Sequence, residues 1–259
     1  MNRTIRTTED VLALLDRLFP PAEAWWDRFY ADRSADRPFF TPEPDENLVS
    51  YLDRGLLSPD RAPASRPDDA ADDAPDPAPA RARALDLGCG PGRNAIHLAA
   101  RGFEVDAVDV SSAAVAWAEE RAREAGVGAT LRLHRASIFE ADLPHARYDL
   151  VYDSGCLHHL PPHRRVSYLA LLDRVLAPGG HFAVTAFAAG AMGSARPDEE
   201  LYRLGALEGG LAWSPDELRS LFRELTPLEI RPMAARPPGS GLFGLPFLLT
   251  GLFQRTTSL

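Results

Sequence analysis

The feature that most constrains the fold is a short apolar strand that runs into a glycine-rich loop and then into a helix. Ala84-Leu85-Asp86-Leu87 is predicted as a buried strand, glycines stand at 88, 90 and 92, and residues 93–101 have helical spacing of apolar side chains. A glycine loop at the carboxyl end of a strand lets a ligand approach the backbone where a side chain would collide. The segment therefore predicts a nucleotide-binding turn.

The alternation of strand and helix continues along the chain. Strands are predicted at 104–108, 130–134, 148–152 and 181–187, with candidate final strands at 228–233 and 243–253. Helices are predicted from Ser111 or Ser112 to about 125, from Pro161 onward, and over 217–225. Because strands that alternate with helices form a parallel sheet covered on both faces, the sequence predicts an α/β fold.

Three parts are predicted along the chain. Residues 58–83 consist only of Ala, Pro, Asp, Arg and Ser, and such a segment lacks the apolar surface needed to order itself, so we predict a flexible linker. Residues 1–57 before it predict two or three helices, whose aromatic side chains we expect to pack over the larger region. Residues 84–259 form the α/β part.

Composition excludes several classes of function. The formal charge of −9 disfavours nucleic acid as a partner, because binding to phosphates depends on clustered positive charge. Every basic side chain other than histidine is Arg, so no Lys-based mechanism is available. Cys89 and Cys156 give no disulfide framework and no zinc spacing. The start of the chain lacks a signal-peptide core and the apolar stretch 242–253 is too short to span a bilayer, so we expect a cytoplasmic protein without membrane contact. We also expect a monomer or a homodimer.

Two carboxylates indicate which nucleotide the loop takes. Asp109 follows Gly88 by 21 residues at the end of the second strand, where a carboxylate accepts ribose hydroxyls. A nicotinamide dinucleotide, as used by a reductase, is disfavoured because Arg93 directly follows Gly92 and the further glycine that a pyrophosphate favours is absent. Asp86 would repel a pyrophosphate and attract a sulfonium and an α-amino group. The pattern favours S-adenosylmethionine.

The block from Ala84 to Asp109 resembles motif I of the class I S-adenosylmethionine-dependent methyltransferases. The resemblance implies a Rossmann-like, seven-stranded, mostly parallel sheet of order 3-2-1-4-5-7-6, with helices on both faces and an N-terminal helical lid. It also implies a set of cofactor contacts, including one from the lid: Phe29, Asp86, Gly88, Cys89, Gly90, Asn94, Asp109, Val110, Ser137, Ile138, Phe139, Asp153, Ser154 and Gly155.

Gly92-Arg93-Asn94, the aromatic N-terminal helices and the segment 148–158 resemble one branch of that family, which contains tellurite, thiopurine and halide or thiol methyltransferases. The implied reaction moves a methyl group to a small nucleophile through sulfur, nitrogen or oxygen. A neutral hydroxyl or an ammonium must also lose a proton, which requires a base. Candidate catalytic groups after the fourth strand are His158, His159, His163 and Asp153.

Other interpretations of this histidine cluster and of the chain remain open. The histidines could instead cap the helix that starts at Pro161 or lie on the surface. We expect no metal there, because Pro161 and Pro162 oppose a regular helical face between His159 and His163 and no carboxylate completes a ligand set. For the whole chain, the alternative to an enzyme is a non-catalytic S-adenosylmethionine-binding subunit of a larger complex.

Overall fold

The computed structural model describes residues 5–60 and 81–256, and its centre is an eight-stranded sheet. The strands are β1 (Arg83–Leu87), β2 (Glu104–Asp109), β3 (Leu131–Arg135), β4 (Tyr148–Ser154), β5 (Leu176–Ala188), β6 (Ala212–Trp213), β7 (Thr226–Pro232) and β8 (Leu248–Gln254). Their order is β3-β2-β1-β4-β5-β8-β7, and the two-residue β6 pairs with β5 outside this path. Among the described strands, β8 runs in the opposite direction to the others, so its pairings with β5 and β7 are antiparallel and the remaining pairings are parallel. If the short β6 is not counted, β7 and β8 are the sixth and seventh strands along the chain, so the predicted fold and the predicted order 3-2-1-4-5-7-6 are confirmed. The additional strand β6 is too short for sequence patterns to indicate.

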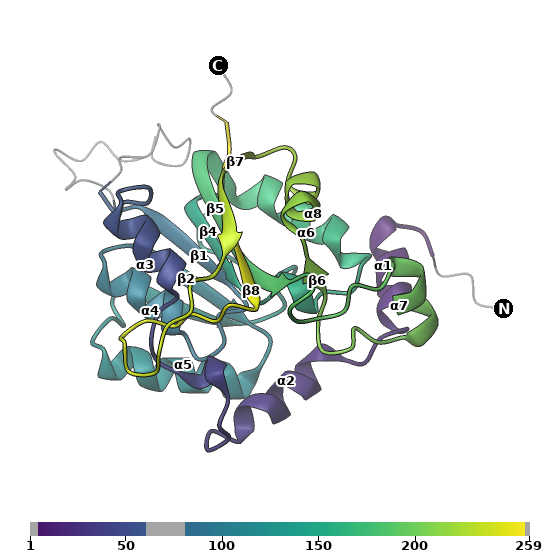
Figure 1. The fold of residues 1–259 in the computed structure, drawn as a ribbon, viewed down its shortest axis with the longest axis horizontal. Helices are drawn as coiled ribbons and strands as arrows, with labels where there is room; N and C mark the ends of the chain where they lie inside the picture. Colours follow the sequence, from purple (N-terminus) through teal and green to yellow (C-terminus); the bar gives the residue numbers. More distant parts are fainter. Residues whose placement is uncertain (1–4, 61–80, 257–259) are drawn as a thin grey trace.

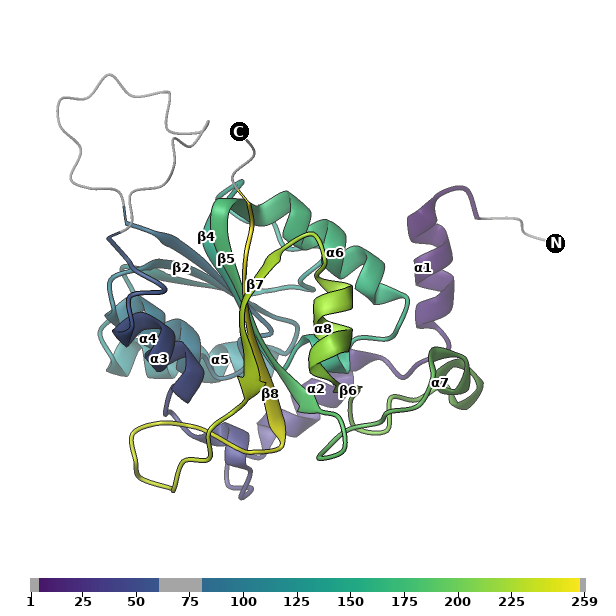
Figure 2. The same ribbon diagram turned by 45° about the horizontal axis from the view of Figure 1, so that its top comes forward.

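Helices cover both faces of the sheet (Figures 1 and 2). On one face lie α3 (Glu46–Asp53), α4 (Arg93–Ala100) and α5 (Ser112–Glu124), and on the other lie α6 (Arg164–Val175) and α8 (Pro215–Leu221). β1 contacts both layers, since Ala84 belongs to the apolar cluster under α3 and α4, whereas Leu85 belongs to the cluster under α6 and α8. Burial on both faces explains why this strand has a nearly continuous apolar sequence.

The helices of the N-terminal piece occupy two different places in the fold. Helix α3 packs into the sheet layer, where Leu48 and Tyr51 are fully buried. Helices α1 (Thr8–Asp16) and α2 (Ala22–Ala31), followed by the short η1 (Pro38–Phe40), lie outside that layer (Figure 2). Most of the predicted linker, residues 61–80, lies outside the described residues, and at its ends Ala82 N donates to Pro59 O at 3.0 Å.

The turns after β2 and β4 matter most for function. Ser111 is the N-cap of α5, because its Oγ accepts from Ala114 N at 3.1 Å, and this decides between the two predicted caps. The turn after β4 contains η3 (Leu157–His159), and a longer loop with α7 (Asp198–Leu204) returns to it, where Leu211 N donates to His158 O at 2.7 Å. None of the helices in the described parts is long and apolar enough to cross a bilayer.

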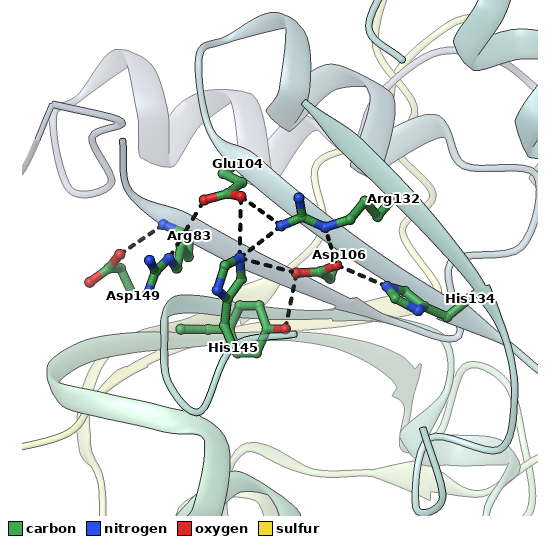
Figure 3. Close-up of polar contacts among 8 residues, drawn as sticks. Arg83, Glu104, Asp106, Arg132, His134, His145 and Asp149 are labelled. Atoms are coloured by element: carbon green, nitrogen blue, oxygen red, sulfur yellow. Dashed lines mark hydrogen bonds and ion pairs between the residues drawn. The ribbon is translucent and has the colours of Figure 1, made fainter. Parts of the chain in front are cut away.

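A charged cluster lies on β2 and its neighbours (Figure 3). Asp106 is fully buried at its centre. Its carboxylate accepts hydrogen bonds from Arg132 Nε at 3.1 Å and from the Tyr148 hydroxyl at 3.0 Å, and it lies 2.8 Å from His134 Nε2. Within residues 5–60 and 81–256, no group of three or more His, Cys, Asp or Glu side chains could hold a metal ion. We call Asp106, Arg132, His134 and Tyr148 together the Asp106 cluster.

Candidate active site

A cavity of about 810 Å³ lies at the carboxyl ends of the parallel strands, beneath α2. One half is lined by residues that follow β1, β2 and β3, and we call it the β1–β3 half. The other is lined by residues of β5 and β8 and of the turn after β4, and we call it the β4–β8 half. The volume lies in the range of small-molecule and cofactor sites.

Most of the predicted site residues line this cavity. They are Phe29, Asp86, Gly88, Cys89, Gly90, Asn94, Asp109, Val110, Ser137, Ile138, Phe139, Ser154, Gly155, His158 and His159. Asp153 and His163 are not among the lining residues. The structure thus brings together residues that are far apart in the sequence.

Two positions of the glycine loop require glycine, both because of their backbone angles and because of the atoms around them. Gly88 has φ of +66°, and a Cβ there would lie 2.8 Å from Cys156 Cβ. Gly90 has φ of +52°, and a Cβ there would lie 2.8 Å from the Tyr30 hydroxyl. Both residues therefore have to be glycine. Tyr30 of the lid lies directly over the loop.

Asp86 is buried in this cavity without a full set of partners. Its exposure is only 2%, and its Oδ2 has no hydrogen-bond partner among the described residues. Burial, with the nearby charges of Asp45 and Asp153, raises the pKa of Asp86 to about 8. A buried carboxylate in this condition is destabilising unless a cationic group pairs with it.

Asp109 holds the loop in shape. Its Oδ2 accepts from Gly90 N and its Oδ1 from Ser111 N, both at 2.8 Å. Burial nevertheless raises its pKa. Because each carboxylate oxygen can accept more than one hydrogen bond, Asp109 retains capacity for a ligand hydroxyl. Val110 and the segment 137–139 line the cavity beside it.

Sequence reasoning missed an ion pair beside Asp86. Fully buried Asp45 lies 2.6 Å from Arg93 Nη2 and accepts from the Ser154 and Tyr152 hydroxyls at 2.6 and 2.8 Å. Arg93 Nη1 is buried and has no partner within the described chain. Arg93 stands in the glycine motif, but Asp45 precedes the predicted linker and nothing in the sequence pattern connects the two.

These atoms provide a test of whether S-adenosylmethionine fits. The amino-acid part of that molecule carries an ammonium and a carboxylate, and it is joined to a cationic sulfonium. Asp86 offers an unsatisfied oxygen, and Arg93 offers an unsatisfied N–H beside it. Asp109 lies at the end of β2, and its carboxylate oxygens are of the type that accepts hydrogen bonds from ribose hydroxyls. The residues fit the cofactor.

The lid is attached by polar contacts and is aromatic on its inner side. Asp27 Oδ1 accepts from the Ser111 and Ser112 hydroxyls and from Ala113 N at the start of α5, at 2.8 to 3.2 Å. Trp26 and Tyr30 line the cavity and stack with ring centroids 5.9 Å apart. The lid thus places aromatic rings over the site, where they reduce access of water.

The two histidines that line the cavity are uncharged at neutral pH. His158 is 3% exposed and stacks on Phe187 with centroids 3.9 Å apart. His159 meets the ring of Trp26 edge-on at 4.7 Å. Burial lowers the pKa of His159 to about 4 and lowers that of His158 as well. Each is therefore a neutral imidazole at pH 7, with one ring nitrogen that carries a proton and donates a hydrogen bond and one that accepts a hydrogen bond.

Asp153 and His163 act on neighbouring parts of the chain. Fully buried Asp153 accepts from Cys156 N and Leu157 N at 2.8 and 3.0 Å and from the Tyr168 hydroxyl at 2.6 Å, which fixes the turn after β4. His163 Nε2 lies 2.7 Å from Asp16 Oδ1 and therefore holds the end of α1.

Comparison with known proteins agrees with this geometry. Residues 84–180 match the family model described as a methyltransferase domain. An uncharacterized methyltransferase of Mycobacterium tuberculosis is 37% identical over 103 residues, which are 40% of this chain and 49% of that protein. The 27-O-demethylrifamycin SV methyltransferase of Amycolatopsis mediterranei is 37% identical over 106 residues, which are 40% of this chain and 38% of that protein. The chain thus spans half or less of the length of these relatives.

A solved structure shares the fold over nearly the whole chain. The 1,6-didemethyltoxoflavin-N1-methyltransferase of Burkholderia thailandensis, with bound 1,6-didemethyltoxoflavin and S-adenosylhomocysteine, superposes with a TM-score of 0.56 and 23% identity. The match covers 99% of this chain and 93% of that one. Residues 84–180 thus match a methyltransferase domain, and the fold over nearly the whole chain is shared with a solved methyltransferase that binds S-adenosylhomocysteine.

Proposed function

We propose that this chain transfers a methyl group from S-adenosylmethionine to a small-molecule nucleophile through sulfur, nitrogen or oxygen. The observation that carries the proposal is the unsatisfied oxygen of buried Asp86 beside the glycine loop. The name of the rifamycin relative, which acts on a small molecule, supports it. The narrower likeness to tellurite, thiopurine and halide or thiol enzymes stays a prediction.

Asp86 and Arg93 would hold the amino-acid end of the cofactor, the loop backbone its middle, and Asp109 its ribose. When bound, S-adenosylmethionine would supply a methyl group activated on a sulfonium: an acceptor lone pair would bond to the methyl carbon in line with the S–C bond, which would break to leave S-adenosylhomocysteine as a thioether. The residues of the chain have to align the acceptor and exclude water. Trp26 and Tyr30 of the lid exclude water.

The histidines bear on how an acceptor loses its proton. His158 and His159 line the cavity and are proposed as the groups that accept a hydrogen bond from the acceptor. Because burial lowers the pKa of both side chains, neither can deprotonate an acceptor fully at neutral pH before methyl transfer. Asp153 and His163, by contrast, are proposed as positioning residues for the turn after β4 and for α1.

Formation of S-adenosylhomocysteine tests the proposal. The purified chain is incubated with S-adenosylmethionine and a panel of thiols, phenols and heteroaromatic amines, while calorimetry measures S-adenosylhomocysteine binding separately. Product that depends on an added acceptor supports the proposal. Binding without product from any acceptor favours the alternative of a non-catalytic subunit, and absence of binding contradicts both. The cytoplasmic location, the monomeric or homodimeric state and the lack of a nucleic-acid partner stay predictions.

A further inference from the structure

The β4–β8 half of the cavity contains polar groups that the proposed cofactor contacts leave unused. Thr185 on β5 is 1% exposed, lines the cavity, and its Oγ1 has no partner among the described residues. His158 lines the same half, and its Nδ1 is buried and also without a partner there. Since buried polar atoms are normally hydrogen-bonded, two such atoms in one half of a cavity indicate a ligand.

The walls of this half are aromatic. The rings are those of Trp26 and Phe39 from the N-terminal piece and Phe187 from β5, with the imidazole of His159 among them. Leu248 of β8 completes the wall. Ring faces and edges at van der Waals distance bind flat molecules well, because such molecules gain contact area without losing many torsional degrees of freedom.

This half also carries no net charge. The turn after β4, β5 and β8 contribute to the lining Ser154, Gly155, Cys156, His158, His159, Leu160, Pro161, Thr185, Phe187 and Leu248. Both histidines are neutral at pH 7, because burial lowers the pKa of each. A carboxylate or a small anion therefore has no counter-charge from these residues.

Each of the three arginines that line the cavity has a partner outside the β4–β8 half, although Nη1 of Arg93 and Nη1 of Arg121 have none among the described residues; the former is the group proposed above to hold the cofactor carboxylate. Arg93 pairs with Asp45 at 2.6 Å. Arg121 donates to Phe40 O at 2.7 Å and lies over the Trp117 ring. Arg164 pairs with Asp16 and with Glu9 beside Phe139, which belongs to the β1–β3 half.

We propose that the β4–β8 half binds a neutral, flat acceptor, and that Thr185 and His158 hold its exchangeable hydrogen-bonding group. This inference rests on the proposed function and names the class of its substrate. It selects hydroxylated or N–H-bearing aromatic molecules over carboxylates, halides and other small anions. Thr185 is then a specificity-determining residue.

Binding to the chain saturated with S-adenosylhomocysteine tests the inference. The probes are 2-naphthol, which is flat and neutral with an exchangeable proton, 2-methoxynaphthalene, which lacks that proton, and 2-naphthoate, which is charged. Calorimetry should give 2-naphthol at least about tenfold tighter binding than either of the others, the factor that one hydrogen bond to the site provides. Equal affinity for 2-naphthoate, or no binding of 2-naphthol, would overturn the proposal.

Variants on neighbouring strands localise the effect. Thr185→Val should weaken 2-naphthol binding about tenfold and leave 2-methoxynaphthalene unchanged, whereas Thr185→Ser should restore the affinity. Thr250→Val is the matched control, because Thr250 is the cross-strand partner of Thr185, is fully buried, and already donates to Arg231 O at 3.1 Å. We expect it to lower the melting temperature without changing affinity for 2-naphthol.

The stability of the ligand-free chain gives a second readout. Thr185→Val exchanges a buried hydroxyl without a partner for a methyl group of the same shape, so its melting temperature should not fall. A fall in melting temperature with unchanged 2-naphthol affinity would show a structural hydroxyl and overturn the proposal. Failure of S-adenosylhomocysteine itself to bind would instead remove the proposed function, and this inference with it.

Discussion

Two buried carboxylates on adjacent strands of this protein have opposite environments. Asp86 on β1 and Asp106 on β2 are 2% and 0% exposed. Asp106 is bonded to Arg132, His134 and the Tyr148 hydroxyl (Figure 3), whereas Asp86 has an oxygen with no partner in the described chain. The strands pair in parallel, and Leu85 lies opposite Asp106. The two side chains are therefore buried to almost the same extent, and they differ only in how many hydrogen-bond partners surround them.

The difference indicates what each carboxylate is for. A buried charge surrounded by donors supports the structure, and its loss leaves those donors unsatisfied. A buried charge without enough partners weakens the ligand-free protein and is relieved when a cation binds. The Asp106 cluster is thus a structural site at the β2–β3 edge, whereas Asp86 is the residue that we propose for cofactor binding.

The largest expected effect comes from Asp106→Ala. The change leaves Arg132, His134 and Tyr148 without their shared acceptor, and the free energy of unfolding should fall by about 3 kcal/mol. Urea denaturation followed by circular dichroism measures this loss. Asp142, an exposed acid, provides the control, and its alanine variant should stay within about 0.5 kcal/mol of the parent protein. Similar losses from both variants would remove the contrast with Asp86.

Asp86→Asn should have the second largest effect, and on binding rather than on folding. Removal of the charge opposite a cationic group should weaken S-adenosylhomocysteine binding about 10- to 100-fold, measured by calorimetry. Stability of the ligand-free protein should not decrease, because burial keeps Asp86 largely protonated near neutral pH and asparagine replaces a neutral carboxyl group of nearly the same shape. Asp106→Asn is the matched control and should leave affinity unchanged at a temperature where it is folded. Loss of stability in Asp86→Asn would mean that Asp86 is structural after all.

The sequence predicted one of these carboxylates and not the other, for a physical reason. Asp86 lies within a local pattern, between a buried strand and a glycine loop, and such patterns are specified by neighbours in the chain. The partners of Asp106 come from β3 and β4, so the cluster exists only after the sheet has formed. Asp45 with Arg93 is the same case, since the contact joins segments on either side of residues 61–80.

The fold itself could be predicted almost completely. Each of the strands β1 to β5 overlaps a predicted strand, although β5 begins at Leu176 rather than at 181, and the helices that follow β1, β2 and β4 have helical periodicity. The division of the N-terminal piece between lid and sheet layer could not be predicted, because α2 and α3 are both amphipathic and differ only in what they pack against. The unsatisfied state of Thr185 is likewise a property of the packed structure.

A pH dependence should follow from Asp86 and sharpen the comparison. Burial raises its pKa to about 8 from an ordinary value near 3.8. Between those values the folded protein holds a proton that the unfolded chain has released, so stability of the ligand-free protein should fall as pH rises toward 8, by about 1 kcal/mol per pH unit near neutrality. Urea denaturation at pH 6, 7 and 8 measures the slope, which should flatten in Asp86→Asn.

The same titration predicts proton release on binding. The ammonium group of the ligand favours the ionised form of Asp86, so S-adenosylhomocysteine binding at pH 7 should expel up to one proton. Calorimetry in buffers of different ionisation enthalpy detects that proton as a difference in apparent enthalpy. Buffer-independent enthalpy in the parent protein would contradict the pairing of Asp86 with the cofactor.

The smallest expected effect comes from Asp27→Ala, which distinguishes the contribution of hydrogen-bond partners to stability from the contribution of burial. Asp27 on α2 resembles Asp106 in having three donors, the hydroxyls of Ser111 and Ser112 and Ala113 N, but its side chain is only partly covered. Asp27→Ala should therefore cost only about 0.5–1 kcal/mol in urea denaturation, the value of a helix cap. It should also loosen α2, seen as greater acrylamide quenching of the Trp25 and Trp26 fluorescence. A loss as large as that of Asp106→Ala would mean that donors alone, without burial, determine the strength of such a site.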